Sequence, residues 1–389
     1  MTRDLIRVNG LSTRFFTQEG QVNAVEDVSL TIREGELYGI VGESGSGKSV
    51  LGLSIIDLIG SPGQITNGEI WYRNAEIADA IRSQRPSAVD DDFVELTSLS
   101  PETRQSLRGK SFSMIFQDPM ASMNPSLTVG TQIAEGVEAQ RRARANPMTT
   151  TSKTNRYGMK DYFTSLFLPR NDYIQPESRE RAVELLDQVG IPDPAERAQE
   201  YPHQFSGGML QRAMIAQALA GEPDLLIADE PTTSLDVTIQ AQIIELLEEL
   251  QRETDLSIMM ITHNLGLIAH MCDRLGVMYA GEIVERGTLP EVFDETVHPY
   301  TKGLLGSVPN LDEINSRLQP IEGNVPSLID SEMGDRCYFV DRCPAAMDIC
   351  HEHPPEYDLE GEHTVQCYLA NERSTDDEKV PASGGDVNE

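Results

Sequence analysis

The segment that most constrains how this chain folds is Gly42–Ser49, which reads GESGSGKS. It matches the pattern G-x-x-x-x-G-K-[S/T]. An apolar run precedes it at Leu37–Val41, and helically spaced apolar residues follow it at 49–59. Glycines let backbone N–H groups curl around phosphate oxygens, and the positive end of a following helix points at the same oxygens. The sequence therefore predicts a strand, a phosphate-binding loop and a helix in succession.

Individual residues of this loop have distinct expected roles. Lys48 can reach the β- and γ-phosphates of a bound nucleotide, and the Ser49 hydroxyl can ligate Mg²⁺. A glycine-rich turn with an incidental lysine is the alternative, which the flanking strand and helix oppose. The predicted phosphate-binding residues are Gly42, Ser44, Gly45, Gly47, Lys48 and Ser49.

Two carboxylates follow a second apolar run. Leu225–Ala228 leads directly into Asp229 and Glu230. A carboxylate at the carboxyl end of a parallel strand beside a phosphate loop suits Mg²⁺, directly or through water. Glu230, one residue later, is placed to polarise an attacking water. The alternative is an acidic pair that only caps a strand, and the PTTSLD sequence that follows at 231–236 argues against it.

The rest of the chain alternates short apolar runs with helical patterns. A further apolar run at 256–261 is separated from Leu225–Ala228 by a helical stretch, which indicates an α/β fold with a largely parallel core sheet. The polar stretch at 75–110 reads as a surface excursion, and 141–176 reads as an irregular segment. Residues 371–389 are expected to form a disordered acidic tail.

The charge of the chain excludes one class of function. It carries 63 Asp and Glu against 31 Lys and Arg, for a net charge of −32, and such a surface repels a nucleic-acid backbone. Only six of the basic residues are lysines, and 25 are arginines. Acidity with so few lysines predicts a halophile protein, kept soluble in concentrated salt; a generically acidic cytosolic protein is the alternative. No apolar run is long enough to cross a bilayer, and the N-terminus does not resemble a signal peptide.

Six motifs in a fixed order resemble those of the ATP-binding-cassette (ABC) ATPases. They are the phosphate loop, Gln117 after a strand, the signature Ser206–Gly208, the Asp229–Glu230 pair, Ser234–Asp236 and Thr262–His263. The resemblance covers about residues 5–290. It implies a P-loop fold with a mostly parallel core sheet, an antiparallel β subdomain and a helical subdomain at about 118–200. The predicted ATPase domain is therefore 1–290.

The resemblance also implies roles for residues outside the loop. Gln117 is expected to sense Mg²⁺ and nucleotide. His263 is expected to hold the γ-phosphate and the attacking water in alignment. Two cassettes would sandwich two ATP molecules between them. Phe15 is the expected adenine-stacking residue, with Phe16 nearly as suitable and core packing as the alternative for both. The residues expected to meet the facing cassette are Ser206, Gly207, Gly208 and Asp236.

The segment after residue 290 narrows the branch of the family. The sequences at 298–305 and 321–328 are similar to the C-terminal extension of dipeptide and oligopeptide importer ATPases, which also occurs in nickel importers. This implies an extension at 291–370 and a place on the cytoplasmic face of the membrane. The implied partners are a second ABC ATPase subunit, two transmembrane permeases and an extracytoplasmic substrate-binding protein. A nickel or other small-solute importer and a soluble ABC ATPase remain as alternatives.

Four of the five cysteines lie close together in this extension. Thiols of a cytosolic chain are better metal ligands than disulfide partners, and the spacing lacks the C-x₂-C pairs typical of structural zinc. Four cysteines also suit an iron–sulfur cluster. Peptide-importer ATPases that resemble this chain carry a [4Fe–4S] cluster, which is therefore expected here beside ATP and Mg²⁺. Zinc and free or disulfide-bonded thiols stay open as alternatives. The four residues are Cys337, Cys343, Cys350 and Cys367.

Overall fold

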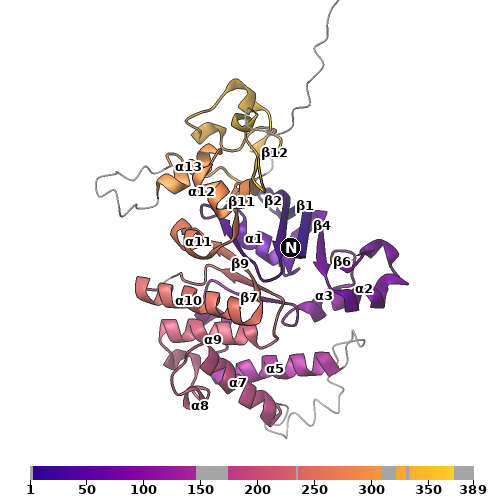
Figure 1. Ribbon diagram of the computed structural model, residues 1–389, viewed down its shortest axis with the longest axis vertical. Helices are drawn as coiled ribbons and strands as arrows, with labels where there is room; N and C mark the ends of the chain where they lie inside the picture. Colours follow the sequence, from indigo (N-terminus) through magenta and orange to yellow (C-terminus); the bar gives the residue numbers. More distant parts are fainter. Residues whose placement is uncertain (1–2, 146–173, 234, 308–320, 330–332, 372–389) are drawn as a thin grey trace, which may run out of the picture.

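The computed structural model describes residues 3–145, 174–233, 235–307, 321–329 and 333–371. They form an eight-stranded sheet with the order β12-β13-β11-β10-β3-β9-β8-β7, and a five-stranded sheet with the order β2-β1-β4-β6-β5. In Figure 1 helices surround the larger sheet, and the smaller sheet lies at one side of it. None of the described helices is long and apolar enough to cross a membrane.

The centre of the larger sheet is parallel, as the alternating pattern predicts. Its strands are short and nearly all buried, because helices or the second sheet cover both of their faces. Only β11 (Glu282–Thr288) and the strands beyond it run antiparallel. The parallel strands are β3 (Leu37–Val41), β7 (Phe112–Ile115), β8 (Leu225–Asp229), β9 (Ser257–Thr262) and β10 (Arg274–Tyr279).

Alternate residues of these strands enter two different cores. In β8, Leu226 packs with α9 (Gly207–Leu219), α10 (Val237–Thr254) and α11 (Leu265–Met271). Ile227 on the opposite face packs with α1 (Lys48–Ile55) and with the antiparallel sheet. The helix that follows the phosphate loop therefore lies between the two sheets, held on both sides by apolar contacts.

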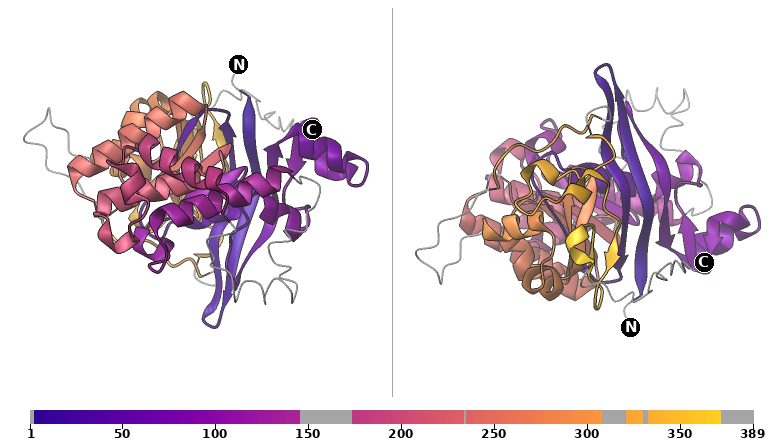
Figure 2. Two further views of the ribbon diagram at one scale, coloured as in Figure 1. Left: turned by 90° about the horizontal axis from the view of Figure 1, so that it is seen from below. Right: turned by 90° about the horizontal axis from the view of Figure 1, so that it is seen from above.

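The antiparallel sheet is built mainly from two long strands and β4. Figure 2 shows the long strands, in indigo, on one side of the molecule and the magenta and orange helices on the other. Its strands are β1 (Asp4–Thr17), β2 (Gly20–Arg33), β4 (Gly63–Arg73), β5 (Val89–Asp90) and β6 (Phe93–Glu95).

The segment at 75–110 is only partly the surface excursion that the sequence predicts. All three residues of β6 are buried, and this strand adds to the edge of β4. The short apolar pair Phe93-Val94 directly follows three aspartates, so it gives no clear strand pattern. The segment also contains α2 (Ala75–Arg82) and α3 (Pro101–Leu107).

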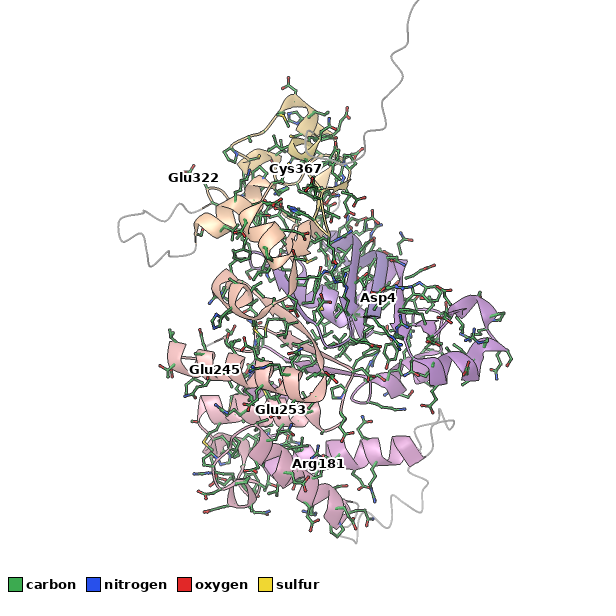
Figure 3. The ribbon with its side chains drawn as sticks, in the orientation of Figure 1. Asp4, Arg181, Glu245, Glu253, Glu322 and Cys367 are labelled. Atoms are coloured by element: carbon green, nitrogen blue, oxygen red, sulfur yellow. The ribbon has the colours of Figure 1, made fainter. Side chains whose placement is uncertain are left out.

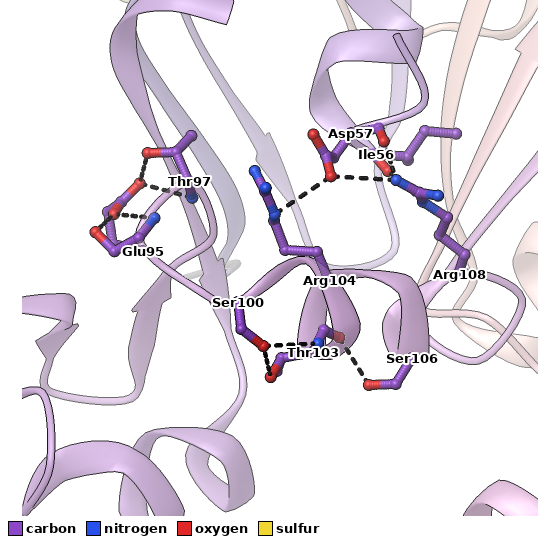
Figure 4. Close-up of polar contacts among 10 residues, drawn as sticks. Ile56, Asp57, Glu95, Thr97, Ser100, Thr103, Arg104, Ser106 and Arg108 are labelled. Carbon is purple, nitrogen blue, oxygen red and sulfur yellow. Dashed lines mark hydrogen bonds and ion pairs between the residues drawn. The ribbon is translucent and has the colours of Figure 1, made fainter. Parts of the chain in front are cut away.

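Helix α3 is tied to the far end of the helix that follows the phosphate loop (Figure 4). Arg104 and the next arginine along, Arg108, both pair with Asp57, at 3.2 and 3.1 Å. The Nε of Arg108 also donates to the carbonyl oxygen of Ile56 at 3.1 Å. These contacts fix the segment against the end of α1.

A helical layer lies below the larger sheet in Figure 1. Its helices share a core with α9, and buried Glu138 of α5 accepts a hydrogen bond from Ser178 of α7 at 2.7 Å. Most of the described part of the predicted irregular segment at 141–176 is helical, because 141–145 belong to α5 and α7 begins at Pro176. Residues 146–173 lie outside the described residues. The helices are α4 (Pro119–Ser122), α5 (Val129–Ala145), α7 (Pro176–Gln188) and α8 (Pro194–Arg197).

The C-terminal region extends the larger sheet through β13, which pairs with β11. Most of the described secondary structure after α13 consists of short strands and 3₁₀ turns, and the predicted acidic tail lies almost wholly outside the described residues. The elements are α12 (Leu289–Asp294), α13 (Pro299–Gly306), η4 (Val340–Arg342), η5 (Asp348–His351), β12 (Tyr357–Asp358), β13 (Thr364–Val365) and η6 (Tyr368–Ala370).

Candidate functional site

The phosphate loop connects β3 to α1 and requires glycine at two positions. A Cβ at Gly42 would collide with the carbonyl oxygen of Met278, and one at Gly47 with that of Ala24. Gly47 also has a φ of +102° where it caps α1. The loop therefore passes close under the neighbouring backbone, and its conformation depends on the absence of side chains there. Gly45 has a φ of +81° but open space around it.

Lys48 folds back over this loop. Its Nζ donates to the carbonyl oxygens of Gly42 at 2.9 Å and Glu43 at 2.7 Å, and the residue is only 5% exposed. Burial lowers the pKa of Lys48, and the carboxylates of Glu230, Asp229 and Glu43 offset part of this effect. The ammonium group is thus held at the loop where the pattern predicts phosphate.

Two oxygen groups meet beside the loop. The Ser49 hydroxyl, in the first turn of α1, donates to Oδ1 of Asp229 at 3.0 Å. Burial raises the pKa of Asp229, and the bond from Ser49 partly lowers it. A hydroxyl and a carboxylate are ligands that Mg²⁺ accepts. The structure therefore brings the two predicted magnesium ligands of the loop and of β8 together.

Glu230 is the point at which several predicted residues meet. Its carboxylate accepts from Nε2 of Gln117 at 3.1 Å and lies 3.1 Å from Nδ1 of His263. The Thr233 hydroxyl donates to the same carboxylate at 2.8 Å. Thr233 was not singled out from the sequence, although its place three residues after Glu230 could have signalled a local side-chain contact.

The backbone and charge state of Glu230 are also unusual. Its φ is +47°, a left-handed conformation that a non-glycine residue adopts at a cost. Burial raises the pKa of Glu230, but hydrogen bonds from His263 and Thr233 lower it more in sum, so the group is an ionised carboxylate near neutral pH. An ionised carboxylate next to the magnesium ligands can accept a proton from water.

The signature residues lie at a different place. Ser206 caps α9 by accepting from the N–H of Met209 at 3.3 Å, and Asp236 caps α10 by accepting from the N–H of Ile239 at 3.0 Å. A Cβ at Gly208 would lie 2.8 Å from Ile239, so the two helix starts are packed together. Among the described residues, no hydrogen bond or ion pair links this pair of helix starts to the phosphate loop. Ser234 lies outside the described residues.

Phe15 lies on β1 and is half-buried, opposite Gly63 of β4. A Cβ at Gly63 would lie 2.6 Å from the Phe15 ring, so the ring packs closely on this glycine. Phe16 is 47% exposed. Adenine stacking by Phe15 stays a prediction, and packing within the sheet remains its alternative.

All four clustered cysteines line one pocket, which is partly open to solvent. Burial raises the pKa of Cys337, Cys343 and Cys367, and backbone N–H groups two residues further on lower it by less in each case. Burial raises the pKa of Cys337 to about 12 and that of Cys367 to about 11. All four are free thiols, and no group of three or more His, Cys, Asp or Glu that could hold a metal ion is found in the described parts of the chain.

Two of the nearby histidines are committed elsewhere. His353 bonds Glu282 at 2.7 Å, and His363 bonds Glu285 at 3.0 Å. Cys272, the one cysteine outside the cluster, is buried directly after α11.

Comparison with known proteins agrees with this geometry. Residues 25–233 match the family model described as ABC transporter, and residues 284–350 match that of the oligopeptide/dipeptide transporter, C-terminal region. The chain is 42% identical to the dipeptide transport ATP-binding protein DppD of Bacillus subtilis, over 95% of this chain and 96% of that protein. It is also 42% identical to the oligopeptide transport ATP-binding protein OppD of Salmonella typhimurium, over 90% and 89% of the two chains.

Solved structures agree on the fold. The dimeric bacterial ABC transporter cassette MJ0796 superposes with a TM-score of 0.52 at 24% identity, over 73% of this chain and 98% of that one. The cassette cbiO1 of Clostridium perfringens superposes with a TM-score of 0.52 at 24% identity, over 75% and 92%. The predicted ABC-cassette fold is thereby confirmed. Since one family model spans more than half of the chain and the relatives align over nearly all of it, this chain belongs to the ABC transporter family.

Proposed function

We propose that this chain is the ATP-hydrolysing subunit of an importer that takes dipeptides or oligopeptides into the cell. The observation that carries the proposal is the convergence of Lys48, Asp229 and Glu230 at one edge of the sheet in a chain whose C-terminal part matches peptide transporters. The relatives named for dipeptide and oligopeptide transport support the substrate class.

The proposed hydrolysis follows from the positions of these side chains. Lys48 and the N–H groups of the loop bind the phosphates of ATP, while Ser49, Asp229 and Gln117 hold its Mg²⁺. Glu230 accepts a proton from the attacking water, and His263 keeps that water aligned with the γ-phosphate. The helix start at Ser206–Gly208 and the Asp236 cap serve the nucleotide of a facing cassette, which makes a pair of cassettes the active unit.

The proposed assembly contains more than this chain. A second ABC ATPase subunit completes the pair, two transmembrane permeases form the path through the membrane, and an extracytoplasmic binding protein delivers the peptide. The chain would then lie on the cytoplasmic face of the membrane, where closure of the cassettes moves the permeases. No nucleic acid takes part, since the net charge of −32 opposes its binding.

Transport in a reconstituted system tests this function. The chain, together with two peptide permeases and a binding protein from the same organism, should support ATP-dependent uptake of a labelled dipeptide or oligopeptide into vesicles. Uptake should stop when Glu230 is replaced by Gln in this chain. Uptake of Ni²⁺ but not of either peptide would assign the chain to a nickel importer. ATP hydrolysis by the reconstituted system without uptake of any of these solutes would contradict the importer function.

We also propose that the four cysteines hold a [4Fe–4S] cluster. The donors fit such a group because four thiols line a single pocket, and four cysteine thiolates are the ligands that such a cluster takes. When bound, a cluster would supply four iron–thiolate bonds that join segments 30 residues apart in sequence, from Cys337 to Cys367.

A third proposal concerns the salt in which the chain works. Exposed acids such as Glu245 and Glu253 on α10 (Figure 3) contribute to a charge that repels itself at low ionic strength. Raising KCl to molar concentration shortens the Debye length to about 3 Å, so the melting temperature should rise by about 5 °C or more. Thermal melts followed by circular dichroism test this, with equal osmolarity of sucrose as the control. Greatest stability at low KCl would contradict adaptation to salt.

A further inference from the structure

Two residues of the C-terminal region reach across the molecule to the phosphate loop. The hydroxyl of Tyr300, in α13, accepts a hydrogen bond from the backbone N–H of Glu43 at 2.8 Å. The guanidinium of Arg342, at the end of η4, donates to both carboxylate oxygens of Glu43, at 2.7 and 3.0 Å. Both contacts are to Glu43, the second residue of the loop. The C-terminal region therefore binds both the main chain and the side chain of Glu43.

The Arg342 side chain is itself firmly placed. It is 5% exposed, and its Nε donates to the carbonyl oxygen of Glu322 at 2.9 Å. The guanidinium also donates to the Tyr279 hydroxyl at 3.3 Å and lies 5.9 Å from the centre of the Phe339 ring. A buried guanidinium that donates to both oxygens of one carboxylate forms a stronger and more directional ion pair than two charges on an open surface.

The ion pair matters because of where the carboxylate lies. The carbonyl oxygen of Glu43 accepts from Nζ of Lys48 at 2.7 Å, so this residue belongs to the same small loop that receives the phosphates. An ATP molecule brings several negative charges to that loop. An uncompensated carboxylate there would repel them, and Arg342 removes most of that repulsion by neutralising Glu43 in place.

We propose that Arg342 and Tyr300 are positioning residues of the nucleotide site, through which the C-terminal region sets the affinity of this chain for ATP. Neither residue needs to touch the nucleotide. Arg342 cancels the charge of Glu43, and Tyr300 fixes the path of its backbone. This inference rests on the proposed use of the loop for ATP, but it adds a dependence of that loop on residues beyond the ATPase domain.

Substitution of Arg342 separates charge compensation from general stability. R342M should weaken binding of a fluorescent trinitrophenyl derivative of ATP, added as its Mg²⁺ complex, by about tenfold. This is the scale expected for one unpaired charge in a partly screened site. The KM for ATP should rise by a similar factor while kcat changes little, since Glu230 and its partners are untouched. R336M is the matched control, because Arg336 lies in the same region and pairs with Asp341 away from the loop.

The double variant E43Q/R342M supplies a rescue that a structural role could not produce. With neither charge present, affinity should return to within about twofold of wild type. An R342M variant that binds like wild type, or a double variant as weak as R342M, would overturn the proposal. A wild-type chain that binds no nucleotide would instead contradict the ATP site itself.

Two milder variants cover the case in which R342M does not fold. R342K keeps the charge but cannot form the bidentate pair, and Y300F keeps the ring packing but loses the acceptor for the Glu43 N–H. Each should weaken nucleotide binding by about threefold without loss of the folded circular dichroism spectrum. Wild-type affinity in both would overturn the proposal.

Discussion

Replacement of Glu230 by Gln should lower the rate of ATP hydrolysis by about 100-fold or more, while ATP still binds. Glutamine keeps the size of the side chain and can accept a hydrogen bond from Thr233, so the local structure should persist. It cannot take a proton from water, and this is the function proposed for the ionised Glu230 carboxylate. Phosphate release measures the rate, and a nucleotide-binding titration measures the affinity.

The same variant should also accumulate in the ATP-bound form. Slow hydrolysis leaves the cassettes closed around ATP, so E230Q with Mg-ATP should elute as a dimer in size-exclusion chromatography and the wild type should not. E245Q is the matched control, since Glu245 is exposed on α10 and is expected to have no part in turnover. Wild-type turnover in E230Q would show that another group accepts the proton.

The central site was predictable because its parts are local in sequence. The loop Gly42–Ser49 is contiguous, and its neighbouring strand and helix are read from residues on either side. Asp229 is the last residue of β8, and Glu230 follows it. Strand β8 is parallel to β9, which in turn is parallel to β3, so sheet topology brings both carboxylates to the edge where the loop begins. Short-range patterns and one general rule about parallel sheets were sufficient for these residues, whereas Gln117 and His263 were expected from the resemblance to the ABC ATPases.

The contacts that the sequence did not reveal are distant or irregular. Arg342 and Glu43 are 299 residues apart, and neither lies in a periodic pattern that would point to the other. The sequence did not decide between Phe15 and Phe16 as the adenine-stacking residue for a different reason. The pairing of β1 with β2 shifts register between Thr13 and Arg14, so simple alternation cannot assign faces to the residues that follow.

Anaerobic purification should yield about four irons and four sulfides per chain and little zinc, if the cysteine pocket holds the proposed cluster. A single zinc ion needs thiolates that converge to about 2.3 Å from one point. The four thiols line one pocket, and the proposed cluster would use all four of them as ligands. Metal and sulfide analysis, with the visible absorption spectrum, distinguishes the two.

Alanine at Cys367, labelled in Figure 3, should abolish the iron content and the visible absorption, because it removes one of four donors. Alanine at Cys272 is the matched control, since this thiol is buried on α11 away from the pocket. Iron lost from both variants would indicate general unfolding, and a zinc-only wild-type protein would reject the cluster. A chain purified without metal and with free thiols would reject both the cluster and zinc. In such a chain Cys337 and Cys367 should be protonated at neutral pH, because burial raises their pKa when no cation is bound.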